Sequence, residues 1–146
     1  MAWFLVLAIL TGVVLPVQAG VNHQLRLSVG HPAIAAGISF LVGTISLGIF
    51  IAAARLSIPA GAVARTAWWH WTGGILGAFF VAAAVILTPR LGAATLVATV
   101  VAGQMVSSLI LDHYGLVGYA RQPLDMGRVV GALLVIAGVF LIQRPR

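Results

Sequence analysis

Cysteine, lysine and glutamate are all absent from the 146-residue sequence. Without cysteine the chain forms no disulfide, has no thiolate ligand for zinc and has no thiol nucleophile. Acidic residues are scarce as well: Asp112 and Asp125 stand against eight arginines, for a formal net charge of +6. Two carboxylates and four scattered histidines offer little for acid–base catalysis or for a metal centre. We therefore expect neither an enzyme nor a bound metal or other cofactor.

Charge of either sign is rare, and apolar residues dominate. Charged residues make up 7% of the chain and hydrophobic residues 62%, whereas soluble domains contain about 25% charged residues. The lipid bilayer is therefore the first expected partner. An arginine excess can indicate nucleic-acid binding. Here, however, the arginines are isolated at the ends of apolar runs, where headgroup contacts and snorkelling account for them. We expect a membrane protein that does not bind nucleic acid.

Five apolar runs are suited to cross the bilayer, which takes about 20 helical residues. They cover residues 2–21, 32–54, 71–88, 91–111 and 126–143. We expect an all-α polytopic integral membrane protein with a single transmembrane domain over residues 1–146, a polar loop at 23–31 and a tight turn at Pro89-Arg90. The first run resembles a signal peptide near Val17-Gln18-Ala19. It lacks a basic start and continues to Val21, however, which favours a retained helix.

Two of these helices carry a polar stripe. Gln104, Ser108 and Asp112 follow one another at intervals of four in the fourth span, and Gln18 and Asn22 do so in the first. Residues four apart share a helix face. Within a membrane such a face is turned to other helices or to a water-filled cavity, not to lipid. Two interpretations stay open: the stripes line a substrate path, or they join helices through hydrogen bonds.

Single residues near the span ends are further candidates. Asp112, beside His113, could couple to protons or hold a cation, or it could cap its helix or pair with an arginine. Asp125 directly precedes the fifth span, where a cap is expected. Trp71 closes a cluster of three tryptophans that is typical of an interfacial anchor, with stacking on a ligand as the alternative. Pairs of small residues, such as Gly127 and Gly131, indicate close helix packing.

Short segments along nearly the whole chain resemble the YdcZ-type proteins, a five-helix branch of the drug/metabolite transporter superfamily. These segments are QAGVN with QLR in 18–26, SFLVGT at 39–44, WxGGxxG at 71–77, PRLGAA at 89–94, AGQ at 102–104, LDHYGL at 111–116 and GALLxxAGV at 131–139.

The resemblance implies a bacterial inner-membrane exporter of small molecules. It implies that five helices form half of a transporter, which works as a dimer or with a related chain. Small multidrug transporters of this superfamily use a glutamate in the first helix. This chain has none, so that mode of proton exchange is not expected. The candidate path residues are Gln18, Asn22, Trp71, Gln104, Ser108, Asp112 and His113. The alternative is a non-transporting helical subunit or packing scaffold for a partner membrane protein.

The arginines give no preferred orientation in the membrane. Five spans place on one side Arg55, Arg65, Arg121 and Arg128, and on the other Arg26, Arg90, Arg144 and Arg146, four against four. Orientation normally follows an arginine and lysine surplus on the cytoplasmic side. Two oppositely inserted copies would supply the inverted symmetry on which many transporters rely. We expect an antiparallel homodimer, or an antiparallel heterodimer with a related chain.

A reporter fused to the C-terminus should therefore be found on both sides of the membrane. Adding two arginines to one side should move it to a single location, because the added charges break the balance. The measurement is the ratio between a reporter active only in the cytoplasm and one active only outside it. A tail that occupies one side and ignores the added charges would rule out dual insertion and leave only the heterodimer.

Overall fold

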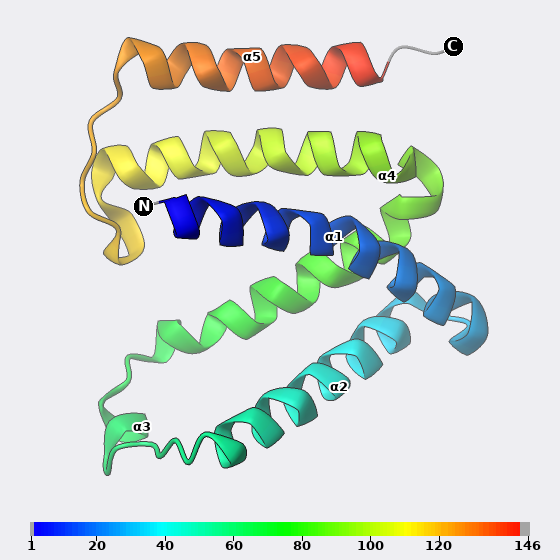
Figure 1. Cartoon of the computed structure of the whole chain (residues 1–146), viewed down its shortest axis with the longest axis vertical. Helices are drawn as coiled ribbons and strands as arrows, with labels where there is room; N and C mark the ends of the chain where they lie inside the picture. Colours follow the sequence, from blue (N-terminus) through cyan, green and yellow to red (C-terminus); the bar gives the residue numbers. More distant parts are fainter. Residues whose placement is uncertain (1, 144–146) are drawn as a thin grey trace. The chain divides into compact units, whose positions relative to one another are not determined.

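The computed structural model describes residues 2–143, and within these it consists of helices with no strand (Figure 1). The long helices are α1 (Ala2–Val29), α2 (Pro32–Ala53), α4 (Thr72–Tyr114) and α5 (Met126–Ile142), and the short ones are α3 (Ala62–Arg65), η1 (Trp68–Trp71) and η2 (Leu116–Gly118). The all-helical polytopic class is confirmed. Three stretches are long and apolar enough to cross a membrane, Trp3–Val29, Pro32–Ala53 and Trp68–Tyr114, and α5 is a shorter apolar helix.

The chain divides into two compact units, Met1–Arg90 and Leu91–Arg146. The first unit holds α1, α2, the connection that follows α2 and the first part of α4. The second unit holds the rest of α4, the following connection and α5. The candidate path residues fall in both units: Gln18, Asn22 and Trp71 lie in the first, and Gln104, Ser108, Asp112 and His113 lie in the second. Arg144 and Arg146, which entered the charge balance, lie outside the described residues.

Helix α1 is longer than the sequence analysis expects, and the polar loop expected at 23–31 is wrong for most of its length. The helix runs through Val29 with Pro16 inside it. It stops at Gly30, which has a positive φ of 81° and whose N–H donates to the Arg26 carbonyl at 2.8 Å. Residues 23–29 include polar side chains but no glycine or proline. Nothing in them breaks a helix before Gly30 supplies the left-handed residue.

The start of α2 is fixed by its own capping group. Nδ1 of His31 accepts a hydrogen bond from the N–H of Ala33 at 3.2 Å, and Pro32 occupies the first turn. Proline suits this place because its missing N–H would have no helical partner there. Ala35 and Ala36 are buried one turn further on, and α2 contacts α1. Small side chains let the two backbones approach.

Helix α2 ends in a Schellman motif whose left-handed residue is an arginine. The N–H of Arg55 donates to Ala52 at 3.1 Å and that of Leu56 donates to Ile51 at 3.0 Å, the paired bonds of this motif. Arg55 has a φ of 53°. Glycine is the usual residue here, because a Cβ makes the left-handed conformation less favourable. An arginine is thus held at a helix end where glycine would fold more readily.

Helix α4 is too long for a single crossing. A straight helix of its 43 residues would extend over roughly 65 Å at about 1.5 Å per residue, about twice the apolar thickness of a bilayer. One residue inside it, Gly92, has non-helical angles, φ 74° and ψ 161°. The break therefore lies at Gly92 and not at Pro89-Arg90 as expected. Proline's fixed φ is compatible with a helix, whereas the angles of Gly92 are essentially restricted to glycine. That α4 holds the expected third and fourth spans stays a prediction.

In the second unit, α5 runs antiparallel to the second part of α4. Nε2 of Gln143 donates to Oγ1 of Thr99 at 3.3 Å, and at the other end of the pair Arg128 binds Asp112. Between these two positions α5 buries Ala132 and Val139. Positions 128, 132, 139 and 143 fall on one helix face at spacings of four, seven and four. This face of α5 is the one joined to α4.

Replacing Gly92 by alanine should lower the free energy of unfolding by about 1–3 kcal/mol, because alanine cannot adopt its backbone angles without strain. Gly103 in the same helix is the matched control. An added Cβ meets nothing within 4 Å at either position, so the backbone alone distinguishes them. Gly103→Ala should be neutral or stabilising by up to about 1 kcal/mol. Unfolding by denaturant in mixed micelles measures both, and equal effects would argue against the break at Gly92.

Candidate functional site

Arg128, in the first turn of α5, is bound by both carboxylates of the chain. Its guanidinium Nη2 forms an ion pair with Oδ2 of Asp112, sixteen residues earlier on α4, and Nη1 donates to the Gln122 carbonyl at 3.2 Å. Its backbone N–H donates to Oδ1 of Asp125 at 3.0 Å, which confirms Asp125 as the helix cap. The side chains of Arg128 and Asp112 are 27% and 19% exposed. Of the alternatives for Asp112, the structure shows pairing with an arginine.

His113 attaches the connection between α4 and α5, residues 115–125, to the end of α4. Its Nδ1 accepts a hydrogen bond from the N–H of Leu124 at 3.2 Å, and its carbonyl accepts one from Nε of Arg121 at 3.3 Å. The ring also meets Tyr114 edge-on, with 4.7 Å between centroids. The backbone of Asp112 adds a bond from the N–H of Gln122 at 2.7 Å. Asp112, His113 and Arg128 thus form one polar cluster.

The rest of the α4 stripe is exposed. Gln104 and Ser108 both lie on the surface of the second unit, and Ser108 Oγ donates to the Gln104 carbonyl one turn earlier at 2.6 Å. This local bond satisfies the hydroxyl without a second helix. The amide of Gln104 is the larger polar group on this part of the stripe. The structure therefore brings Asp112 and His113 into the cluster and leaves Gln104 and Ser108 along the helix below it.

The other candidates belong to the first unit. Gln18 is exposed, whereas Asn22 is 5% exposed and is the buried polar residue of the described chain. Nδ1 of the adjacent His23 is also buried, with no hydrogen-bond partner among residues 2–143. Trp71 ends the 3-10 helix η1 and is exposed. Sequence analysis missed His23, since a lone histidine in a polar segment has no pattern to distinguish it. A shared path for the two stripes stays a prediction.

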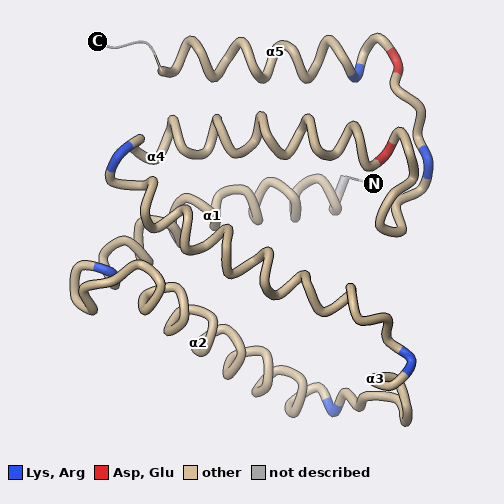
Figure 2. Tube along the Cα trace, turned by 180° about the vertical axis from the view of Figure 1, so that it is seen from behind, with Lys and Arg blue, Asp and Glu red and all other residues tan. Residues whose placement is uncertain are grey.

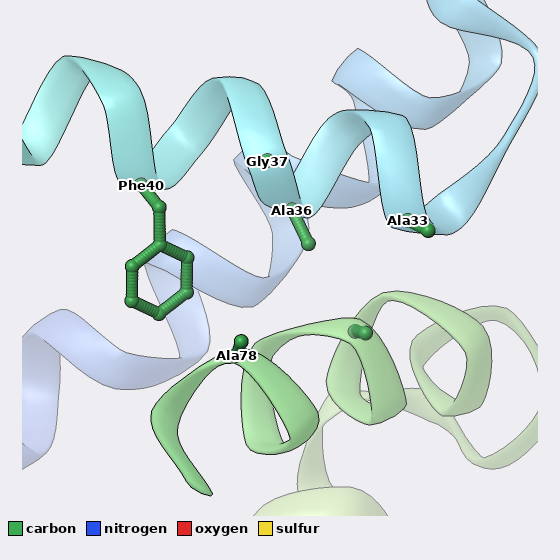
Figure 3. A pocket seen from close by; sticks show the side chains of 6 residues that line it. Ala33, Ala36, Gly37, Phe40 and Ala78 are labelled. Atoms are coloured by element: carbon green, nitrogen blue, oxygen red, sulfur yellow. The ribbon is translucent and has the colours of Figure 1, made fainter. Parts of the chain in front are cut away.

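A groove of about 230 Å³ in the first unit lies between α2 and the first part of α4 (Figure 3). The residues that line it are Ala33, Ala36, Gly37, Phe40, Ala78 and Ala82. The Phe40 ring lies over Gly77, where an added Cβ would come within 3.5 Å of Cζ. Gly77 thus lies in ordinary contact distance of the Phe40 ring. The lining offers no side-chain hydrogen-bonding group to orient a polar ligand.

Chemical groups for catalysis or metal binding do not gather in either unit. Among residues 2–143 no three histidine or carboxylate side chains come together as a metal site requires. Within the described part of the chain, long apolar helices are combined with one ion pair at a helix end and with polar residues along helix faces. These features define a polytopic helical membrane protein.

The chain matches the family model described as "Putative inner membrane exporter, YdcZ" over residues 3–141, and it belongs to this family. It is also 37% identical over 82 residues to "Inner membrane protein YdcZ" of Escherichia coli (strain K12). That alignment covers 56% of this chain and 54% of the relative, so the chain spans about half the length of the curated relative it matches. No solved structure matches. The resemblance seen in the sequence is confirmed, and the protein is a multi-pass protein of the inner membrane.

The Asp112–Arg128 pair should stabilise the second unit measurably. Asp112→Asn should lower the free energy of unfolding by about 1–3 kcal/mol, between the values for exposed and buried pairs, because it leaves the half-buried guanidinium without its counter-charge. The double variant with Arg128→Gln should lose less than the sum of the single changes. Denaturation in micelles measures the cycle.

Asp125→Asn is the matched control, because asparagine caps a helix about as well as aspartate. It should change stability little. If Asp112→Asn and Asp125→Asn had the same effect, or if the two single changes of the cycle simply added, the ion pair would not contribute to the stability of the unit.

Proposed function

We propose that this chain is one half of an exporter of small molecules and works as an antiparallel dimer in the inner membrane. The partner is a second copy or a related five-helix chain. The polar stripes of α1 and of the second part of α4 line the substrate path. Gln18, Asn22, Gln104 and Ser108 face it along its length, and Asp112 and His113 lie at its end. The family description supports export, and the exposure of Gln18 and Gln104 on apolar helices supports the path.

Gln104 is the observation that carries this proposal. It lies within the 21 uncharged residues of 91–111, and it is exposed in the isolated chain. An amide in the hydrocarbon layer without a hydrogen-bond partner is unfavourable by several kcal/mol, roughly the 2–7 kcal/mol of an unpaired buried amide. A single chain in lipid would leave Gln104 in that situation. A second chain, or water in a path between chains, removes it. Gln18 is exposed on α1 in the same way.

The dimer has surfaces suited to it. On α5 the face joined to α4 carries Ala132 and Val139, whereas Gly127 and Gly131 are exposed on another face. An added Cβ at Gly131 meets nothing within 4 Å. Glycines four residues apart allow helices from two chains to approach closely. The even arginine balance allows the second copy to insert in the opposite orientation.

Asp112 has a defined place in this proposal. Its carboxylate is paired with Arg128 at the end of the α4 stripe. A substrate or proton that reaches it competes with that guanidinium, so binding there and release of Arg128 are linked. Release would also loosen the connection, because Arg128 holds Gln122 through Nη1. Asp112 is thereby proposed to link occupancy of the path to loosening of the connection between α4 and α5.

Single cysteines at Gln18 and Gln104, in this chain without native cysteine, should react with a small charged methanethiosulfonate, because water fills the path. Cysteines at Val13 and Val106 are matched controls. Both valines are exposed in the chain and lie on other faces of the same helices, where lipid should prevent reaction. Labelling of intact vesicles, followed by mass spectrometry, gives the rates.

The same labelling distinguishes export from a scaffold role. If Gln18→Cys and Gln104→Cys are as unreactive as the valine controls in folded protein, the stripes join helices and the scaffold alternative holds. Flux is then measured with a panel of metabolites and organic cations in reconstituted vesicles, and a path substrate should slow labelling at both positions.

A further inference from the structure

The first unit contains positive charge without any acidic residue of its own. Residues 1–90 include four arginines and neither aspartate, since the two carboxylates are at 112 and 125 (Figure 2). Both carboxylates are already bound to Arg128, one through the ion pair and one as the helix cap. The arginines of the first unit therefore have no acidic partner within residues 2–90. An arginine next to the hydrocarbon layer needs an anionic partner more than one in water.

Two of these arginines, Arg55 and Arg65, flank the connection between α2 and α4. This connection, residues 54–71, begins where α2 ends at Ala53 and finishes where α4 begins at Thr72. Because both helices are apolar enough to cross the membrane, the connection lies at the membrane boundary. Arg65 is exposed, and its Nη2 donates to the Ala60 carbonyl at 3.0 Å. That bond uses one of the five N–H donors of a guanidinium.

The same connection exposes large apolar side chains. Trp68 is 80% exposed, and the other exposed members are Leu56, Ile58, Val63, Trp69 and Trp71. A connection in water would not favour this set of side chains. Tryptophan rings are suited to the headgroup level, where an apolar body meets lipid and the indole N–H meets polar groups. Aromatic and aliphatic side chains around two arginines match a phospholipid, which has acyl chains next to a phosphate.

We propose that residues 54–71 form a binding surface for an anionic phospholipid, with Arg55 and Arg65 contacting the headgroup phosphate and the tryptophans embedded in the interface. Guanidinium groups bind phosphate through paired N–H donors in a fixed fork. A lipid with net negative charge satisfies both arginines better than a zwitterionic one, whose own cation competes. This surface does not depend on export and would exist equally in a scaffold protein.

The connection between α4 and α5, residues 115–125, also exposes apolar side chains, among them Val117 and Tyr119, but its charged and aromatic groups differ. Nε of its Arg121 donates to the His113 carbonyl, and its Leu124 N–H is held by the His113 ring. It contains no tryptophan and includes Asp125. Its polar groups are thus directed to the chain itself. The contrast assigns lipid recognition to the connection between α2 and α4.

Arg55 permits a clean separation of binding from folding. It occupies the left-handed position of a Schellman motif, with a φ of 53°. Arg55→Gly removes the guanidinium while supplying the residue that this position favours. The variant should therefore be at least as stable as the wild type and still bind anionic lipid less well. A loss of binding in this variant cannot be caused by unfolding.

The experiment uses the full chain with Trp3→Phe, so that fluorescence comes from the three tryptophans at 68, 69 and 71. The protein is placed in nanodiscs of phosphatidylcholine that contain a small fraction of either phosphatidylglycerol or phosphatidylcholine brominated near the headgroup. Phosphatidylglycerol should quench at a lower mole fraction. Its advantage should fall about fivefold with Arg55→Gly and about fivefold with Arg65→Gln, the effect of one arginine at an anionic surface. Arg90→Gln should leave it unchanged.

Three results would overturn the proposal. The two brominated lipids could quench equally, which would mean that charge is not recognised. The preference could survive both arginine variants, which would place the lipid elsewhere. Finally, aqueous acrylamide could quench these tryptophans while neither lipid does, which would place the connection in water or against a second chain.

Discussion

The backbone hydrogen bond is the constraint on which this structure depends. Hydrocarbon offers no partner to an N–H or carbonyl, so the chain satisfies these groups within helices and confines its breaks to a few positions. At each break a specific residue completes the bonding: Gly30 and His31 between α1 and α2, Arg55 after α2, and Asp125 before α5. Gly92 interrupts α4 with angles that suit glycine alone. Side-chain packing inside the units is sparse by comparison, and most large apolar residues remain exposed for lipid or a partner.

The scarcity of negative charge has a second, separate effect. With two carboxylates in the sequence, their placement decides which arginines can be neutralised internally. Both are used on Arg128, one on its guanidinium and one on its backbone N–H. The guanidinium of Arg128 is thereby paired within the second unit, while the first unit has four arginines and no acidic residue of its own. The second unit thus contains an internal ion pair, whereas residues 1–90 contain arginines but no carboxylate side chain.

Sequence reasoning recovers what local patterns encode. Apolar runs give the helices, and the position of Asp125 three residues before Arg128 gives the cap. The continuation of α1 through residues 23–29 is not predicted, because polar side chains indicate a loop there. The absence of glycine and proline from these residues is what allows the helix to continue. The sequence predicts the break at Pro89, whereas the structure has it at Gly92. Backbone dihedral angles cannot be read from a sequence. Asp112–Arg128 and Thr99–Gln143 join residues 16 and 44 positions apart. Such partners depend on how the connection between helices is folded, which no local pattern specifies.

The two fastenings between α4 and α5 also restrict how the second unit can move. A helix held to another at one point can swing about that point; a second, separated contact on the same face prevents this swing. Thr99–Gln143 and Asp112–Arg128 are two such points. They differ in kind, because one is a neutral hydrogen bond and the other is an ion pair that gains strength as water is excluded. The two contacts therefore limit how far α5 can slide or splay from the second part of α4.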